Sequence, residues 1–493
     1  MQKIGTKMRF KLIFSIVSFM TVLCGISMAI PAIVDYFYNQ PTGGDRSMLA
    51  ATLTVLCGLS GYAVFKTDKE PLRAKEMFLT TTLVWLSFTF FSALPFYFSI
   101  YDFSFTDAFF ESMSGLTTTG ATVITGLDTL DKGLLIWRSL TQWLGGLGII
   151  VVVLTVFPTL HIGGLQFFTT ESADKSDRSA PKIAQMMRAI ISFFLLLSIA
   201  CAGCLWLAGM TPFDAINHSM TTIATGGFST KDASIGFYHN AAIEWIITLF
   251  MAVSGLPLII GLLIWKQKWQ QIKNNEQITT YFWICFFSIA LISLYRWYHI
   301  GPMTDFGDIL RSTTFAMISV ITTSGFVTEN YMQWGNFAIV FFLILLMTGA
   351  CTGSTSGGIK MFRYSILLKT TKTRMKSMAQ PYGVFIPRYG EKPITDDILI
   401  GIMVFIGLYF VFTAVSTLAL SLTGLDLVTS LSGSLSALSN VGPALGHIIG
   451  PDKTFASLPD AAKWIMSVDM LLGRLEFITV LMIFTPYIWK KNI

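Results

Sequence analysis

The sequence predicts an all-α membrane protein with many crossings, built mainly from four copies of one helical unit. Two observations predict this class. Of the 493 residues, 53% are hydrophobic and only 13% are charged, and apolar segments near membrane-spanning length follow one another along the chain. In addition, a short polar run that ends in glycine recurs between these segments. Ordinary soluble folds are excluded.

The apolar segments give ten candidate crossings. Each is long enough for a membrane-spanning helix and is bounded by polar or basic residues. They lie near residues 10–34, 48–65, 77–100, 134–160, 190–209, 243–265, 279–298, 337–361, 398–422 and 464–488.

The basic residues orient these crossings. Of the 34 Lys and Arg residues, 25 fall in seven stretches that share one side of the membrane if ten crossings are correct. Positive charge favours the cytoplasmic side, so we expect both termini in the cytoplasm. The net charge of +6 therefore reflects orientation in the lipid bilayer. Because no aromatic-laced basic patch accompanies it, we expect no nucleic-acid partner.

The first apolar segment also resembles a signal peptide, with its basic flank MQKIGTKMR. No convincing small-residue cleavage site follows, so we expect a retained helix. All six cysteines lie in or beside apolar segments, where they act as small hydrophobic residues. The spacing of Cys201 and Cys204 is typical of redox pairs, but no second pair or nearby His favours a metal site.

Four of the extracytoplasmic connections share a pattern. Each begins with an Asp near an aromatic residue or Leu, continues as a helix too short to cross the bilayer, and ends in a Thr, Ser or Asn run closed by glycine. The four are FTDAFFESMSGLTTTGA, PFDAINHSMTTIATGGF, FGDILRSTTFAMISVITTSGF and GLDLVTSLSGSLSALSNVGPA. Their polar runs are closed by Gly120, Gly226, Gly325 and Gly442. Since two crossings separate successive copies, the repeats are parallel and can close into a ring around a central pore.

The chemistry of this pattern favours a cation. We expect Asp107, Asp214, Asp308 and Asp426 to cap the short helices, whose partially negative C-terminal ends then face a common centre. Non-helical backbone at membrane depth must line protein or water, and a ring of oxygens can replace the hydration shell of a monovalent cation. A structural role in helix packing is the alternative. The four matched copies favour the ring.

The eighth segment is interrupted by TGACTGSTSGGIK, which has too many glycines and hydroxyls for an undisturbed helix. We expect a flexible loop beneath the ring, with an early helix end as the alternative. The tenth segment carries Asp469, Arg474 and Glu476. On one continuous helix the two acids share a face, and Arg474 points elsewhere. We expect Arg474 to face the pore and repel cations, unless it pairs with a carboxylate on another helix.

At these residues the chain resembles the Trk/Ktr/HKT superfamily of potassium transporters, in particular its TrkH/TrkG branch. The resemblance covers nearly the whole chain, and its leading helix pair is similar to that of this branch. It rests on TTTGA, WRSLTQWLGGLGII, TIATGGFST, ITTSGFVTEN, GACTGSTSGGIKMFR, NVGPA and GRLEFITVL.

The resemblance implies potassium uptake across the bacterial inner membrane through a channel-like pore, with K⁺ as the transported ion and no covalent cofactor. The implied selectivity filter comprises Thr118, Thr119, Gly120, Ala224, Thr225, Gly226, Thr323, Ser324, Gly325, Asn440, Val441 and Gly442. The implied gating loop comprises Gly349, Gly353, Ser354, Thr355, Gly357 and Gly358, with Arg474 as the pore arginine.

The resemblance also implies an assembly. We expect a homodimer bound by a separate cytosolic nucleotide-binding regulator of the TrkA type, because the cytoplasmic loops are too short to form such a domain. The basic segment 360–376 is one candidate contact, and contact with anionic lipid is the alternative. The expected units are an N-terminal helix pair at 1–70 and pore repeats at 71–170, 171–275, 276–378 and 379–493.

Two other functions match parts of the sequence. His447 and Asp452 have the HxxxxD spacing of membrane acyltransferases, but two residues make a loose motif and no second block accompanies them, so we expect no enzyme. A symporter that couples K⁺ to H⁺ or Na⁺ is the second alternative. The parallel repeats favour a pore over alternating access, but the sequence leaves ion coupling open.

Overall fold

The computed structural model describes residues 8–68, 70–155, 180–300, 305–390 and 392–489. Within these ranges the chain is almost entirely helical, and the one sheet is a hairpin of two short antiparallel strands, β1 (Arg388–Tyr389) and β2 (Lys392–Pro393). The predicted all-α class is confirmed. The chain folds as an N-terminal helical unit followed by four repeats of a long helix, a short inner helix and a second outer helix.

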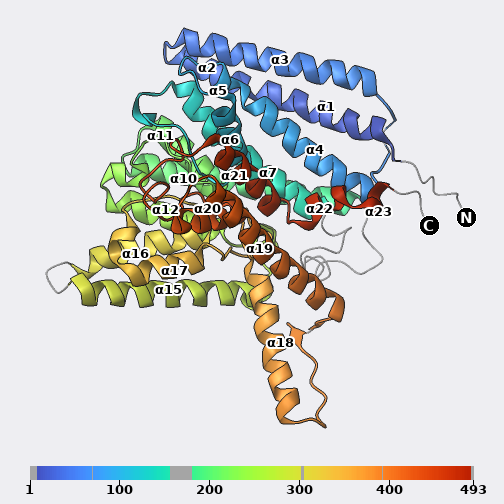
Figure 1. The fold of residues 1–493 in the computed structure, drawn as a ribbon, viewed down its shortest axis with the longest axis vertical. Helices are drawn as coiled ribbons and strands as arrows, with labels where there is room; N and C mark the ends of the chain where they lie inside the picture. Colours follow the sequence, from blue (N-terminus) through green and yellow to red (C-terminus); the bar gives the residue numbers. More distant parts are fainter. Residues whose placement is uncertain (1–7, 69, 156–179, 301–304, 391, 490–493) are drawn as a thin grey trace, which may run out of the picture.

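The N-terminal unit consists of α1 (Phe10–Ser27), α2 (Ala29–Phe37) and α3 (Pro41–Phe65), and Figure 1 shows α1 and α3 side by side. Two glycines allow this close approach. A Cβ atom on Gly25 would lie 2.8 Å from the backbone N of Val55, and one on Gly58 would lie 2.8 Å from the backbone N of Val22. Small residues let helix backbones approach in a membrane, where packing replaces the hydrophobic effect as the driving force.

The four repeats follow in chain order. Repeat 1 contains α4 (Ala74–Ser92), α5 (Leu94–Tyr97), α6 (Phe105–Leu116), η1 (Leu127–Thr129) and α7 (Lys132–Thr155). Repeat 2 contains α10 (Ala180–Leu207), α11 (Pro212–Ile223), η2 (Ser234–Tyr238), α12 (Ala241–Ser254), α13 (Ile259–Trp265) and α14 (Trp269–Lys273). Repeat 3 contains α15 (Glu276–Ile300), α16 (Phe306–Ile321), η3 (Tyr331–Trp334), α17 (Asn336–Leu345) and α18 (Met361–Ala379). Repeat 4 contains α19 (Asp396–Leu422), α20 (Leu427–Ser439), α21 (Asp460–Arg474), α22 (Ile478–Phe484) and α23 (Pro486–Trp489).

The described residues hold seven helices long and apolar enough to cross a membrane, and an eighth span if the bent pair α12 and α13 is counted as one. This pair is bent by 91°, so the sixth candidate crossing, at 243–265, is not one continuous helix. The sequence SGLPL accounts for the bend, because Pro257 lacks an amide hydrogen and cannot continue the ladder of helix hydrogen bonds. The end of the fourth candidate, at 156–160, lies outside the described residues.

The tenth predicted crossing is also broken. Helix α21 ends at Arg474, and α22 begins at Ile478 after Glu476 adopts a left-handed φ of 55°. Our placement of Asp469 and Glu476 on one helix face is therefore wrong. The Asp469 carboxylate instead accepts a hydrogen bond from Ser416, and Glu476 lies 2.7 Å from Arg363 in an ion pair.

The interruption of the eighth segment is confirmed. Helix α17 ends at Leu345, and residues 346–360 form a loop before α18 begins at Met361. Figure 1 shows α18 extending away from the rest of the molecule as an arm, with the β1–β2 hairpin beside the returning chain. The basic segment predicted at 360–376 thus lies mostly on this arm.

The short helices α6, α11, α16 and α20 are capped at their N-termini, but mostly not by the predicted aspartates. Asp426 caps α20 as expected, through its carboxylate and the amides of Val428 and Thr429. Ser104 caps α6, Thr211 caps α11 and Asp305 caps α16. Asp107 and Asp214 lie three residues inside their helices and accept hydrogen bonds from the capping hydroxyls, and Asp308 pairs with Arg311 at 2.8 Å. A hydroxyl followed by an acid three residues later is another common way to cap a helix N-terminus.

We expect Gly58→Leu to destabilise the purified protein by about 1–3 kcal/mol, because the new side chain would force α1 away from α3. Thermal unfolding in detergent measures the change. Gly407→Leu is the control, since a Cβ at Gly407 on α19 meets no atom within 4 Å. Equal unfolding temperatures for the two variants would contradict the close α1–α3 contact.

Candidate functional site

Each short inner helix ends in the same tight turn. The residue that begins the turn has a left-handed φ: 52° at Thr118, 52° at Thr225, 56° at Thr323 and 54° at Asn440. Non-glycine residues seldom adopt this conformation. The next residue in each turn donates its amide to a carbonyl near the helix end. These bonds are Thr119 to Ser114 at 2.8 Å, Gly226 to Thr221 at 2.8 Å, Ser324 to Ser319 at 2.8 Å and Val441 to Ser436 at 3.0 Å.

A glycine with positive φ follows two residues after each left-handed residue. The values are 86° at Gly120, 77° at Gly227, 75° at Gly325 and 104° at Gly442. By backbone conformation, therefore, the counterpart of Gly120 in repeat 2 is Gly227. Our sequence alignment at Gly226 was wrong by one residue, and Ala224 is the helix C-cap instead of the first turn residue.

The four turns converge and close into a ring. A Cβ atom on Gly120, in the first turn, would overlap the carbonyl oxygen of Gly226 in the second turn. In the same way, a Cβ atom on the glycine of each other turn would overlap a carbonyl oxygen of the next turn: Gly227 with Ser324, Gly325 with Val441, and Gly442 with Thr119. Each turn thus touches its neighbour through a glycine and a carbonyl oxygen, and the fourth turn contacts the first. This is the convergence that the repeat pattern predicted.

The side chains of the turns mainly support the ring. Thr117 and Thr119 share a hydroxyl–hydroxyl hydrogen bond of 2.8 Å, and Thr322 and Ser324 share one of 2.9 Å. The Asn440 amide donates to the Thr119 hydroxyl at 3.0 Å. The turns lie at the C-terminal ends of the inner helices, where the carbonyl groups give a partially negative potential. Such a ring of backbone oxygens favours a cation.

The interior loop between α17 and α18 lies against this ring. The amide of Gly357 donates to the Thr323 hydroxyl at 2.8 Å, and the Thr355 hydroxyl donates to the carbonyl of Ile223 at 3.2 Å. A Cβ atom on Gly357 would overlap the carbonyl oxygen of Ser439. The loop therefore contacts the ends of the inner helices of repeats 2, 3 and 4.

Arg474 is buried beside this loop. One guanidinium nitrogen donates to the carbonyl of Thr355 at 2.7 Å and another lies 3.4 Å from the carbonyl of Gly145. Within the described residues Arg474 has no carboxylate partner, and its Nε has no hydrogen-bond partner. Buried charges are normally paired, which makes this arrangement unusual. Because no carboxylate of the described residues pairs with Arg474, the alternative of an ion pair with another helix is wrong for that part of the chain.

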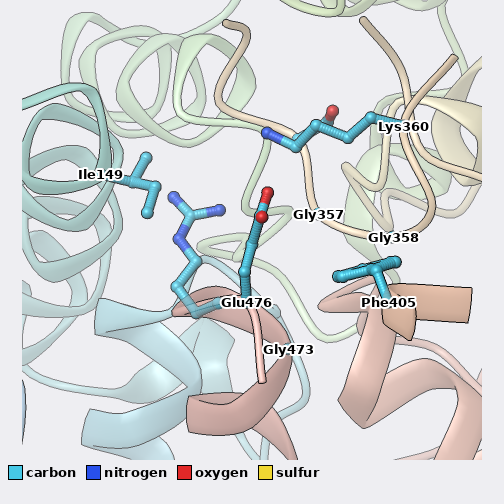
Figure 2. Close-up of a pocket in the computed structure, with 9 residues that line it drawn as sticks. Ile149, Gly357, Gly358, Lys360, Phe405, Gly473 and Glu476 are labelled. Atoms are coloured by element: carbon cyan, nitrogen blue, oxygen red, sulfur yellow. The ribbon is translucent and has the colours of Figure 1, made fainter. Parts of the chain in front are cut away.

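A small cavity lies beneath the loop, lined by Gly357, Gly358, Arg474 and neighbouring charged residues. Figure 2 shows Lys360 and Glu476 extending into it from opposite sides, with Phe405 nearby. Glu476 is held by Arg363, whose guanidinium stacks 3.6 Å from the Phe405 ring centroid. Sequence reasoning did not identify Lys360 as a lining residue, although it closely follows the glycine-rich stretch.

Besides the ion pair of Arg363 and Glu476, the structure contains a second buried ion pair that the sequence analysis did not predict. Glu111 on α6 and Arg138 on α7 lie 2.8 Å apart, with 1% of each side chain exposed. Glu111 also accepts the amide of Val123 at 2.9 Å, and Arg138 donates to the carbonyl of Ser229 at 2.7 Å. The pair ties the chain after the first turn to the chain after the second. A Glu and an Arg in otherwise apolar helices were the available sequence signal.

In the described parts of the chain, no group of three or more His, Cys, Asp or Glu side chains is placed to bind a metal ion. The described cysteines are all free. Among the described residues, seven or eight candidate membrane spans and four turns that close into a ring define a helical membrane protein built from repeated units.

Comparison with known proteins assigns the family. Residues 45–491 match the family model TrkH, cation transport protein, and the chain belongs to this family. It is 36% identical to the Trk system potassium uptake protein TrkI of Halomonas elongata, over 99% of this chain and 98% of that one. It is 35% identical to the Trk system potassium uptake protein TrkH of Escherichia coli, over 98% of this chain and 100% of that one. The crystal structure of the potassium transporter TrkH from Vibrio parahaemolyticus has a TM-score of 0.89 at 33% identity, and the match covers 98% of this chain and 100% of that one.

We expect Gly227→Ala to reduce cation flux in proteoliposomes by at least about tenfold, because its Cβ would overlap the Ser324 carbonyl at a φ that disfavours alanine. The control is Gly203→Ala on α10, where a Cβ meets no atom within 4 Å. Wild-type flux in Gly227→Ala would show that the ring tolerates expansion at this contact.

Proposed function

We propose that this protein carries K⁺ into a bacterial cell through a channel-like pore in the inner membrane, with both termini in the cytoplasm. The closed ring of four glycine–carbonyl contacts is the observation that carries the proposal. The names of the related TrkI and TrkH proteins, which are potassium uptake proteins, support K⁺ as the transported ion.

The selectivity filter is formed by the predicted turn residues of repeats 1, 3 and 4 and, in repeat 2, by Thr225, Gly226 and Gly227. Backbone oxygens of these turns replace part of the hydration shell of K⁺. The left-handed residues orient the peptide groups of the turns differently from the peptide groups inside a helix. The C-terminal ends of α6, α11, α16 and α20 add a potential that is favourable for the cation. The protein is not an enzyme, and K⁺ is its cargo.

The gate consists of the loop that contains Gly349, Gly353, Ser354, Thr355, Gly357 and Gly358, together with Arg474. The loop contacts three of the four inner helix ends, and the unpaired charge of Arg474 lies directly against Thr355. A cation that leaves the filter meets both the loop and this positive charge. Opening therefore requires the loop and the guanidinium to move away from the axis.

The working unit is a homodimer that binds a cytosolic nucleotide-binding regulator of the TrkA type. The α18 arm supports this part of the proposal, since Figure 1 shows it extending from the body and its Lys372, Arg374 and Lys376 are exposed. The predicted residue units, an N-terminal pair at 1–70 and four pore repeats from 71 to 493, make up each subunit.

Coupling to H⁺ or Na⁺ is the alternative to a simple pore. The two differ in the membrane potential at which K⁺ current reverses. A pore reverses at the K⁺ equilibrium potential, whereas a symporter shifts that potential when the H⁺ or Na⁺ gradient is changed. Recordings across defined gradients separate them.

We expect Gly120→Asp to abolish ⁸⁶Rb⁺ uptake into proteoliposomes that contain this chain alone. The side chain would overlap the carbonyl of Gly226 at a φ of 86° and obstruct the ring. Gly203→Ala, where the new Cβ meets no atom within 4 Å, is the control. Retained uptake in a folded Gly120→Asp variant would refute the filter assignment.

We expect Arg474→Ala to raise basal ⁸⁶Rb⁺ uptake several-fold, because it removes the positive charge beside the loop. This increase corresponds to a barrier lowered by about 1 kcal/mol or more. Uptake is normalised to the amount of folded protein. Arg474→Lys, which keeps the charge, should stay near the wild-type rate. A lower protein yield with an unchanged normalised rate would assign Arg474 a purely structural role.

A further inference from the structure

Gln142 on α7 bridges two backbone groups of the second turn. Its side chain is fully buried, with 0% exposed. The amide nitrogen donates to the carbonyl oxygen of Gly226 at 2.7 Å, and the amide oxygen accepts the backbone amide of Phe228 at 3.1 Å. Both ends of the side-chain amide are thus used on one short stretch of the neighbouring repeat.

The second turn has a gap that this side chain fills. Gly226 occupies the position held by Thr119, Ser324 and Val441 in the other turns. A Cβ atom on Gly226 would overlap the Gln142 side chain. A residue of repeat 1 therefore replaces, in repeat 2, the side chain that the other three turns carry themselves. This accounts for the double glycine in ATGG.

The bridge acts directly on the ring. The carbonyl oxygen of Gly226 is the atom that Gly120 touches where the first and second turns meet. Among the described residues it is the one of the four ring carbonyls that accepts a side-chain hydrogen bond. Because a peptide group rotates as a unit, the Gln142 bond fixes the orientation of the Gly226–Gly227 peptide and the spacing at this contact.

The same face of α7 holds the chain beyond the turn. Arg138, one helical turn before Gln142, donates to the carbonyl of Ser229 at 2.7 Å and stacks 4.2 Å from the ring centroid of Phe228. The stretch from Gly226 to Ser229 is therefore fixed at several backbone points by one helix of the preceding repeat.

We propose that Gln142 is a positioning residue for ion selectivity: its side-chain amide sets the geometry of the second filter turn from outside the pore. The proposal rests on the function proposed above. Discrimination between K⁺ and the smaller Na⁺ depends on the placement of the coordinating carbonyls, whether through cavity size or through their number and field. Loss of the bridge lets the Gly226 peptide relax, and the filter then distinguishes the two ions less well.

Gln277 on α15 provides a matched control elsewhere in the chain. It is also a fully buried glutamine, with 0% exposed, and it also bridges a backbone amide and a backbone carbonyl. Its amide oxygen accepts the backbone amide of Thr352 at 3.0 Å, and its nitrogen lies 3.4 Å from the carbonyl of the same residue. Thr352 belongs to the interior loop. The two glutamines make the same kind of bridge, one to the ring and one to the loop.

The test compares Gln142→Leu, Gln142→Glu and Gln277→Leu in proteoliposomes by ⁸⁶Rb⁺ uptake under competition from K⁺ or Na⁺. The ratio of the Na⁺ and K⁺ concentrations that halve uptake does not depend on the amount of folded protein. Gln142→Glu has nearly the same shape and still accepts from Phe228, but once its carboxyl is ionised it cannot donate to Gly226, so this variant is assayed at alkaline pH. We expect both Gln142 variants to lower the ratio about tenfold, in line with the loss of one buried hydrogen bond.

We expect Gln277→Leu to change the rate of uptake but to keep the wild-type ratio. A wild-type ratio in both Gln142 variants, or an equal loss in Gln277→Leu, would overturn the proposal while K⁺ transport itself stands. If the wild-type chain takes up no ⁸⁶Rb⁺, the proposed function fails, and the selectivity role fails with it.

Discussion

The structure depends on the contact between a glycine of one turn and a carbonyl oxygen of the next, repeated until the ring closes. This contact leaves no room for a Cβ atom, so glycine is required at Gly120, Gly227, Gly325 and Gly442. It also requires each inner helix to end in the same left-handed turn. The caps at the outer ends and the buried Glu111–Arg138 pair hold the helices and the following chain in that arrangement.

The sequence was sufficient for the fold class, because four polar turns of similar composition, spaced at similar intervals along an apolar chain, indicate one unit used four times. It was not sufficient for the register of the second turn. Two adjacent glycines at 226 and 227 fit the pattern equally well, and only the positive φ and the neighbour contact identify Gly227. The helix caps were shifted for a related reason, since Ser104 and Thr211 precede an acid by three residues and either residue type can bind the free amides.

The charged residues show a second limit. Sequence reasoning recognised that Asp469, Arg474 and Glu476 are expensive in a membrane helix. Their partners are distant in sequence, so the interaction of Asp469 with Ser416 and of Glu476 with Arg363 followed only from the fold. The break at Glu476 separates these residues onto different elements and leaves Arg474 with carbonyl oxygens alone among the described residues. The loop between α17 and α18 was easier to recognise, because its glycines and hydroxyls mark non-helical backbone in the sequence itself.

The side chain that crosses from α7 into the second turn means that the repeats are no longer interchangeable modules. A turn grafted from the first or third repeat into the second would bring its own Thr or Ser to a place already occupied by Gln142. The second turn therefore depends on a side chain of the preceding repeat. Substitutions on the outer helix of one quarter and in the turn of the next are expected to have evolved together.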